Sequence, residues 1–181
     1  MKINISPIIL AFLIIVGMTG CNEATGGTPS TAPVRIGLYD SRSIAIAYAG
    51  TKYFDQAMSA LQEEYKQALA NGDQAVIDEI EARAEEQQAQ MHLQAFSTAP
   101  VDEILAQIKE LLPGIMQQAN VSMLVSKWDQ ETLDGYPDAE MVDVTLLLVD
   151  ALEPSEQQRN YAIEIQEQEP IPLEEAENID D

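Results

Sequence analysis

One cysteine, one histidine, one tryptophan and a large excess of carboxylates are the side chains with which this sequence could do chemistry. Cys21 follows a start with one positive charge, Lys2, and an apolar run from Ile5 to Gly17. A helix of about 13 residues reaches roughly 20 Å, which is too short to cross a hydrocarbon core of about 30 Å. A charged start, a short apolar run and small residues before a break are typical of a secretory signal. We therefore expect residues 1–20 to be a signal peptide.

Thr19-Gly20, directly before Cys21, resembles the lipobox of bacterial lipoproteins, in which the cysteine thiol receives a diacylglycerol and becomes the first residue of the mature chain. A lone thiol in an oxidising compartment has no disulfide partner, and acylation gives it a role. The alternative is a plain signal peptide with a chance cysteine. We expect lipidation at Cys21, a location in the cell envelope facing the periplasm, and attachment to a membrane through the lipid anchor only. Asn22, by analogy with lipoprotein sorting, favours the outer membrane.

The net charge of −22 arises from 31 acidic and 9 basic residues spread along the whole chain. Such a surface repels phosphate backbones and anionic headgroups, so nucleic acid is not an expected partner. The simplest interpretation of this charge is solubility, and the alternative is attraction to basic clients or cations. His92 has no nucleophile signature around it, so we expect a surface residue and not a catalytic base. The sequence contains no EF-hand loop, glycine-rich phosphate loop or HExxH zinc motif, and we predict no catalytic residue, metal site or cofactor.

A carboxylate group and the single tryptophan each allow two interpretations, one structural and one chemical. One group of carboxylates crowded on a predicted helix is expected to be its solvated face, with weak attraction of divalent cations as the alternative. Its members are Asp78, Glu79, Glu81, Glu85 and Glu86. We expect Trp128 to pack at a strand end, with ligand stacking as the alternative.

Composition divides the mature chain into three parts. Residues 21–33 are small, polar and rich in Gly and Pro, which predicts a flexible tether. Residues 34–155 have the length of one ordinary domain. Residues 156–181 are rich in Gln and Glu and contain few large apolar side chains, so we expect an acidic, disordered tail.

Helical periodicity dominates the first part of the domain. Apolar residues at three- and four-residue spacing predict one helix after Thr51 and a second one ending near Phe96. The intervening Asn71-Gly72-Asp73 should end the first helix and cap the second, giving an antiparallel hairpin. A third apolar stripe runs from Val101 to Ala119, and Pro113-Gly114 should kink or break it.

Strand signals lie on either side of these helices. Val34–Tyr39, Val121–Ser126 and Met141–Val144 are short and β-prone, and Thr145–Leu152 is typical of a closing helix. The predicted fold class is α+β and mostly helical, with an antiparallel helical hairpin or coiled-coil arm on a small β-containing body. The arm is expected to cover about residues 51–119.

This order of elements resembles the Skp/OmpH family of periplasmic chaperones. The strand Arg35–Asp40 matches the family's first strand, and Val121–Val125 matches the strand that follows its helices. Tyr136 and the triplet Asp143-Val144-Thr145 stand where the family has a Tyr-containing turn and an Asp-(Ile/Val)-Thr element. The resemblance covers residues 34–152 as a succession of elements.

The resemblance implies a homotrimer whose helical arms enclose unfolded outer-membrane proteins, with no catalysis. The apolar residues that would face such a client are Phe54, Met58, Leu61, Tyr65, Ile77, Ile80 and Met91. The alternative for these residues is that they pack the hairpin against itself. The predicted function is a holdase or an envelope assembly factor, and the alternative is a structural lipoprotein that binds one other, folded envelope protein. A more distant alternative is an enzyme or a subunit of one.

Overall fold

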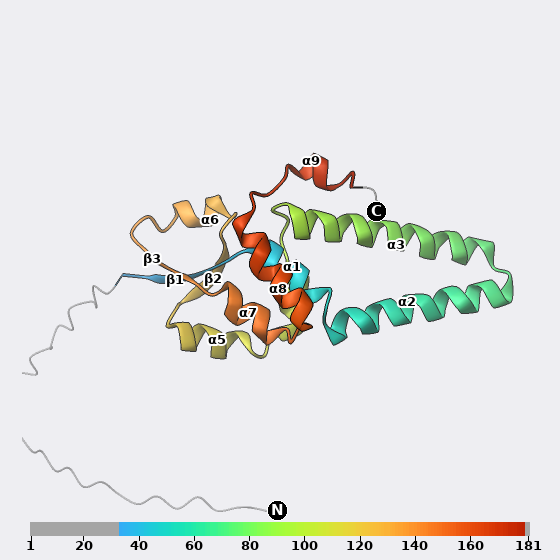
Figure 1. The fold of residues 1–181 in the computed structure, drawn as a ribbon, viewed down its shortest axis with the longest axis horizontal. Coiled ribbons are helices and arrows are strands. Elements are labelled where there is room, and N and C mark those ends of the chain that lie inside the picture. Colours follow the sequence, from blue (N-terminus) through green and yellow to red (C-terminus); the bar gives the residue numbers. More distant parts are fainter. Residues whose placement is uncertain (1–32, 180–181) are drawn as a thin grey trace, which may run out of the picture. The chain divides into compact units, whose positions relative to one another are not determined.

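The strand expected after Pro33 lies at the centre of a three-stranded parallel sheet (Figure 1). The computed structural model describes residues 33–179; the predicted signal peptide, Cys21 and all but the last residue of the predicted tether lie outside this range. β1 (Arg35–Tyr39) pairs on one side with β2 (Met123–Ser126) and on the other with β3 (Glu140–Asp143), so that the strand order is β2-β1-β3. All three predicted strands are therefore confirmed, and they form one sheet.

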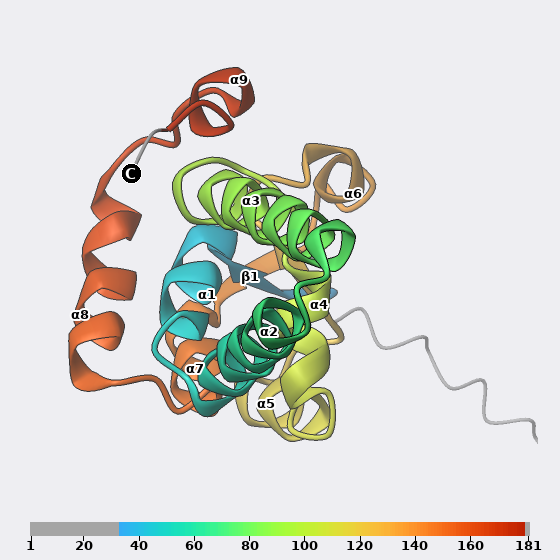
Figure 2. The same ribbon diagram turned by 90° about the vertical axis from the view of Figure 1, so that its right-hand side faces the viewer.

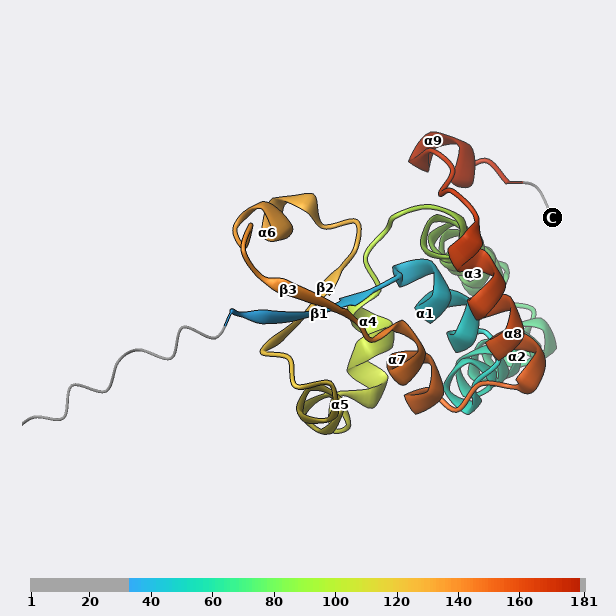
Figure 3. The same cartoon turned by 60° about the vertical axis from the view of Figure 1, so that its left-hand side comes forward.

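The two crossover connections lie on opposite faces of this sheet. The chain moves from β1 to β2 in one direction and from β2 past β1 to β3 in the other, and right-handed crossovers then require opposite faces. Figure 3 shows α5 (Leu112–Ala119) on one side of the strands and α6 (Gln130–Asp134) on the other. At the centre of the sheet, a Cβ on Gly37 would lie 2.9 Å from Leu124 Cδ2 and 3.1 Å from Val144 Cγ2. Glycine at this position leaves room for the side chains of Leu124 on β2 and of Val144, the residue before α7.

Three polar caps define the helices that follow β1. Asp40 caps α1 (Ser41–Tyr48) by accepting a hydrogen bond from the Arg42 amide. Thr51 caps α2 (Lys52–Asn71) and Asp73 caps α3 (Gln74–Phe96), each by accepting the amide of the third residue beyond it. Gly72 between them has φ 67°, a left-handed conformation in which glycine avoids a steric penalty. The sequence signals for the hairpin are thus confirmed.

The hairpin is closed near its tip and opens toward its base (Figure 1). Near the tip, Ala68, Ile77 and Ile80 are buried, and Leu61 and Tyr65 pack against them. Closer to the base, α2 and α3 diverge, and the arm joins the rest of the fold through α1.

The third apolar stripe belongs to the body and not to the arm. It forms α4 (Asp102–Leu105), the short 3-10 helix η1 (Ala106–Ile108) and α5, and its buried residues join the main core. The arm therefore ends at Phe96, and the expected boundary at residue 119 is wrong. The helical interruption falls at residues 109–111, ahead of Pro113, because the proline ring clashes with the carbonyl four residues earlier while fitting the first turn of a new helix.

The C-terminal part of the chain is ordered, contrary to the sequence-based expectation. After α7 (Thr145–Ala151), residues 156–179 form α8 (Glu156–Glu164), the 3-10 helix η2 (Ile165–Glu167) and α9 (Leu173–Ala176). Figure 2 shows α8 lying alongside α1. Ala162 and Ala176 are fully buried, and the Ser43 hydroxyl donates to the Ala162 carbonyl at 2.7 Å. Small side chains and long-range hydrogen bonds hold this segment, where composition alone indicated disorder.

The main core lies where α1, α4, η1, α5, α7 and α8 meet the sheet. Its fully buried side chains are Ile44, Ala47, Val101, Val144, Leu148, Val149, Leu152 and Ala162. The observed fold is the predicted one in class: α+β and mostly helical, with a helical hairpin on a small β-containing body.

Candidate functional site

An apolar cleft lies between α2 and α3 where the hairpin opens. Its volume is ≈ 340 Å³, and its lining residues are Phe54, Met58, Leu61, Ala84, Gln87, Gln88, Met91 and His92. Methionine is flexible and polarisable, so a cleft with Met58 and Met91 on facing helices can adapt to apolar groups of different shapes.

The structure separates the seven predicted client-facing residues into two groups. Phe54, Met58, Leu61 and Met91 line the open cleft and are partly exposed. By contrast, Ile77 and Ile80 are buried between the two helices near the tip, and Leu61 and Tyr65 pack against them. For Ile77 in particular the alternative interpretation, packing of the hairpin against itself, describes what is observed. Leu61, Tyr65 and Ile80 also line a shallow cleft of ≈ 400 Å³ on the arm.

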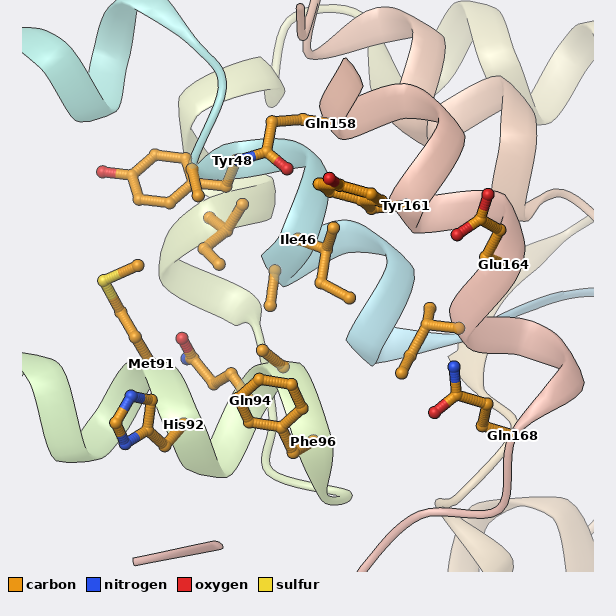
Figure 4. A pocket seen from close by; sticks show the side chains of 15 residues that line it. Ile46, Tyr48, Met91, His92, Gln94, Phe96, Gln158, Tyr161, Glu164 and Gln168 are labelled. Carbon is orange, nitrogen blue, oxygen red and sulfur yellow. The ribbon is translucent and has the colours of Figure 1, made fainter. Parts of the chain in front are cut away.

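A second cavity of ≈ 440 Å³ lies between α1, α3 and the C-terminal segment (Figure 4). Figure 4 shows Met91, His92 and Phe96 on α3 opposite Ile46 on α1 and Tyr161 on α8. Most of the lining is apolar, with amide and hydroxyl groups at its rim. A concave, largely apolar site of this size with a few polar groups is the usual form of a binding pocket.

A third cleft of ≈ 430 Å³ adjoins the other two and is more polar. It is lined by Tyr48, Arg83, Glu86, Gln87, Gln90, Met91, Gln94, Glu103, Ile104 and Gln107. Met91 lines all three hollows, so they meet at one residue near the base of α3. We refer to these three hollows together as the Met91 groove.

Polar contacts fix the walls of the Met91 groove. The Gln94 side chain is almost fully buried and donates to the Pro100 carbonyl at 2.8 Å and to a carboxylate oxygen of Glu103. The Tyr48 ring meets the Phe54 ring edge to face with centroids 5.8 Å apart, which joins α1 to the base of α2. Burial, followed by the nearby Glu103 carboxylate, raises the pKa of Tyr48, so its hydroxyl remains protonated at neutral pH.

Most residues of the groove were not recognised from the sequence, Tyr48, Ile46 and Tyr161 among them. Tyr48 and Ile46 lie on a helix that carried no functional signal, and Tyr161 lies in the segment expected to be disordered. His92 was expected at the surface, but it is buried, with its ring centroid 6.0 Å from that of Phe96. The sequence carries no local signal for this cavity, because its side chains become neighbours only when α1, α3 and α8 pack together.

A buried ion cluster at the carboxyl end of β1 also escaped prediction. Asp40 and Arg42 are each 1% exposed, and the carboxylate accepts from Arg42 Nε at 3.1 Å and from Nη2 at 2.9 Å. Lys127, after β2, forms a second ion pair with Asp40. Burial alone would raise the pKa of Asp40, but the hydrogen bonds from Arg42 and Lys127 outweigh it and hold that pKa below its usual value. Trp128 packs against this cluster, as expected for a residue at a strand end, with Arg42 Cζ 5.0 Å from its ring centroid.

This ion cluster is structural in character. Both Asp40 oxygens are occupied, and Arg42 Nη1 donates to the Gln168 carbonyl at 2.8 Å, so the guanidinium is committed to internal partners. The predicted carboxylate face of α3 is exposed throughout, as expected. Within residues 33–179, no three His, Cys, Asp or Glu side chains are grouped so that they could hold a metal ion. No helix in the described part of the chain is long and apolar enough to span a bilayer.

Comparison of this chain with protein-family models, with curated proteins and with solved structures gives no match. The geometry and chemistry of the Met91 groove are therefore the basis on which a function can be proposed.

Proposed function

We propose that this protein is a non-catalytic lipoprotein of the cell envelope that holds apolar segments of unfolded polypeptides, outer-membrane proteins among them. The observation that carries the proposal is the meeting of three open hollows at Met91, at the base of a projecting helical arm. An extended chain placed there has apolar surface for its side chains in the cleft between α2 and α3 and in the cavity beside α1 and α8.

The chemistry of the groove suits a polypeptide of varied sequence. Met58, Met91, Phe54 and Tyr48 offer adaptable apolar and aromatic contacts. Gln87 and other partly exposed amides beside them can donate to and accept from the backbone of a chain that has no secondary structure of its own. Weak, reversible binding of an unfolded polypeptide needs an adaptable surface of this kind and no reactive group.

The succession of elements adds support from the resemblance to Skp/OmpH chaperones. That resemblance requires the segments near Arg35 and Leu124 to share a sheet, and the Ser122 amide indeed donates to the Arg35 carbonyl at 2.8 Å beside the β1–β2 pair. With lipidation at Cys21, the arm of each protomer of a homotrimer would extend into the periplasm from a lipid-anchored body.

The test is suppression of aggregation of unfolded β-barrel proteins by the full mature chain. We expect Met91→Gln to reduce this suppression severalfold, because it places a polar amide where the three hollows meet. Met116→Gln is the matched control, since Met116 is also half-buried but lies on α5 and lines none of the three hollows. Unchanged suppression in Met91→Gln would contradict the proposed site. Capture of one folded partner without any suppression would favour the scaffold alternative.

A further inference from the structure

We infer that the segments held in the Met91 groove are basic: apolar stretches flanked by lysine or arginine. This inference rests on the proposed function and adds the chemical class of the client. The supporting observation is that carboxylates on the arm and at the rim of the groove have no lysine or arginine partner among the residues that the structure describes.

Almost every cation of the folded region already has an internal carboxylate partner. Seven of the eight Lys and Arg side chains in residues 33–179 lie in ion pairs, Lys66 being the exception in that range. Because carboxylates greatly outnumber these cations, most carboxylates in this range have no cation beside them. The electrostatic potential around the molecule is therefore negative.

The arm contributes much of this negative potential. Residues 52–96 contain nine acidic and three basic side chains. Two of the three basic side chains are occupied, since Lys52 pairs with Glu153 and Arg83 pairs with Glu64. A client that approaches the arm from solution thus meets a negative surface before it meets apolar contacts.

Carboxylates also stand at the rim of the Met91 groove. Glu86 and Glu103 line the cleft beside Gln90, and Glu164 lines the cavity beside Tyr161. Within residues 33–179 no cation pairs with Glu86 or Glu164, and both are exposed. A lysine or arginine flanking an apolar stretch could lay its methylene stem on Met91 or a tyrosine ring and place its charge at this rim.

The test compares fluorescent peptides that share one apolar core and are flanked by lysine, serine or glutamate. With the full mature chain at low ionic strength, we expect the lysine-flanked peptide to bind at least about tenfold more tightly than the glutamate-flanked one. The difference should shrink to less than about twofold near 1 M salt, where the Debye length is about 3 Å.

Paired variants locate the effect in the groove. Glu86→Gln combined with Glu164→Gln should weaken the lysine-flanked peptide about threefold and leave the serine-flanked peptide unchanged. The control combines Glu174→Gln with Glu175→Gln, two exposed carboxylates on α9 that line none of the three hollows, and should change neither peptide. Equal binding of the lysine- and glutamate-flanked peptides would overturn the charge preference and leave the proposed function standing. Failure of all three peptides to bind would instead count against the proposed function.

Discussion

The Asp40–Arg42 pair joins three parts of the chain that are far apart in sequence. The Arg42 guanidinium bonds Asp40 at the end of β1 and the Gln168 carbonyl in the C-terminal segment, while Asp40 pairs with Lys127 after β2. Burying charges in this way is favourable only when every partner is present, because an unpaired buried ion loses its hydration without compensation. The cluster therefore acts as one unit.

Replacing Arg42 by methionine should be strongly destabilising. Arg42→Met retains most of the side-chain volume but removes two hydrogen bonds from a fully buried carboxylate, and we expect a loss of about 3–5 kcal/mol in the free energy of unfolding. Denaturant unfolding at neutral pH measures it. Arg159→Met is the matched control: Arg159 pairs with Asp150 at the surface, and its loss should leave the free energy of unfolding nearly unchanged. Equal effects of the two variants would contradict the structural role of the cluster.

Tyr39 predicts a loss of stability at alkaline pH. Burial, followed by the charges of Asp102 and Asp129, raises the pKa of Tyr39 to about 12, whereas in the unfolded chain it is about 10. The unfolded state therefore releases the proton first. The contribution of Tyr39 is fully present below about pH 10 and is lost as pH rises toward 12, by up to about 3 kcal/mol.

Tyr39→Phe should remove this part of the pH dependence, and Tyr136→Phe, at an exposed position, should not. The measurement is denaturant unfolding at about pH 8 and about pH 11, with phenolate absorbance followed in parallel. A wild-type chain with no more alkaline loss than the Tyr39→Phe variant would show that the buried phenol does not titrate late.

At the scale of single elements, local signals in the sequence were sufficient for the two helices of the arm. Thr51 and Asp73 cap these helices through bonds to amides three residues away, and both were identified from residue type and position. The ordered structure of α8 could not be identified in this way, because Ala162 is buried by α1 and its carbonyl accepts from a serine 119 residues earlier. For the same reason, part of the arm cleft was predictable from helix periodicity, while the cavity shared with α1 and α8 was not.

Substitutions at two glycines distinguish the effect of backbone conformation on stability from the effect of packing. A Cβ would meet nothing within 4 Å at Gly72 or at Gly114, but Gly72 has φ 67° whereas Gly114 lies within α5. Gly72→Ala should destabilise the protein by about 1 kcal/mol, because alanine is strained in the left-handed region. Gly114→Ala should stabilise it by about 0.4–1 kcal/mol, because alanine reduces the entropy of the unfolded chain. Thermal and denaturant unfolding of both variants would test the opposite signs.

The docking of α8 can be tested at Gly50. A Cβ there would lie 2.4 Å from Gln158 Cγ and 2.7 Å from Gln158 Cβ, so Gly50→Ala should push the start of α8 away from α1 and cost about 1–3 kcal/mol. Gly135→Ala is the control, since its Cβ would meet only the Thr132 carbonyl oxygen, at 3.2 Å. Hydrogen exchange should report faster opening of residues 156–167 in the Gly50 variant alone. If those residues exchange rapidly in the wild-type chain as well, α8 is not docked in solution.

For the whole molecule, the sheet indicates association with further copies. Three strands of four or five residues are marginal by themselves, and the outer strands β2 and β3 each have one edge unpaired within residues 33–179. Apolar side chains remain exposed on and around β3. These are Val34, Tyr136, Met141 and Leu146, with 38–46% of each accessible.

We therefore predict that the mature chain is a homotrimer joined through this side of the body, as the Skp/OmpH resemblance implies. Sedimentation equilibrium should give three times the protomer mass, and Met141→Lys should shift the population toward monomer by placing a charge in the contact. Leu69→Lys is the control, because Leu69 is 53% exposed near the tip of the arm, away from the sheet. The three acidic arms of such a trimer would repel one another. High salt should therefore bring the arms closer together without changing the mass of the trimer. A monodisperse wild-type monomer at micromolar concentration would exclude the trimer, and the Met91 groove would then have to act within a single protomer.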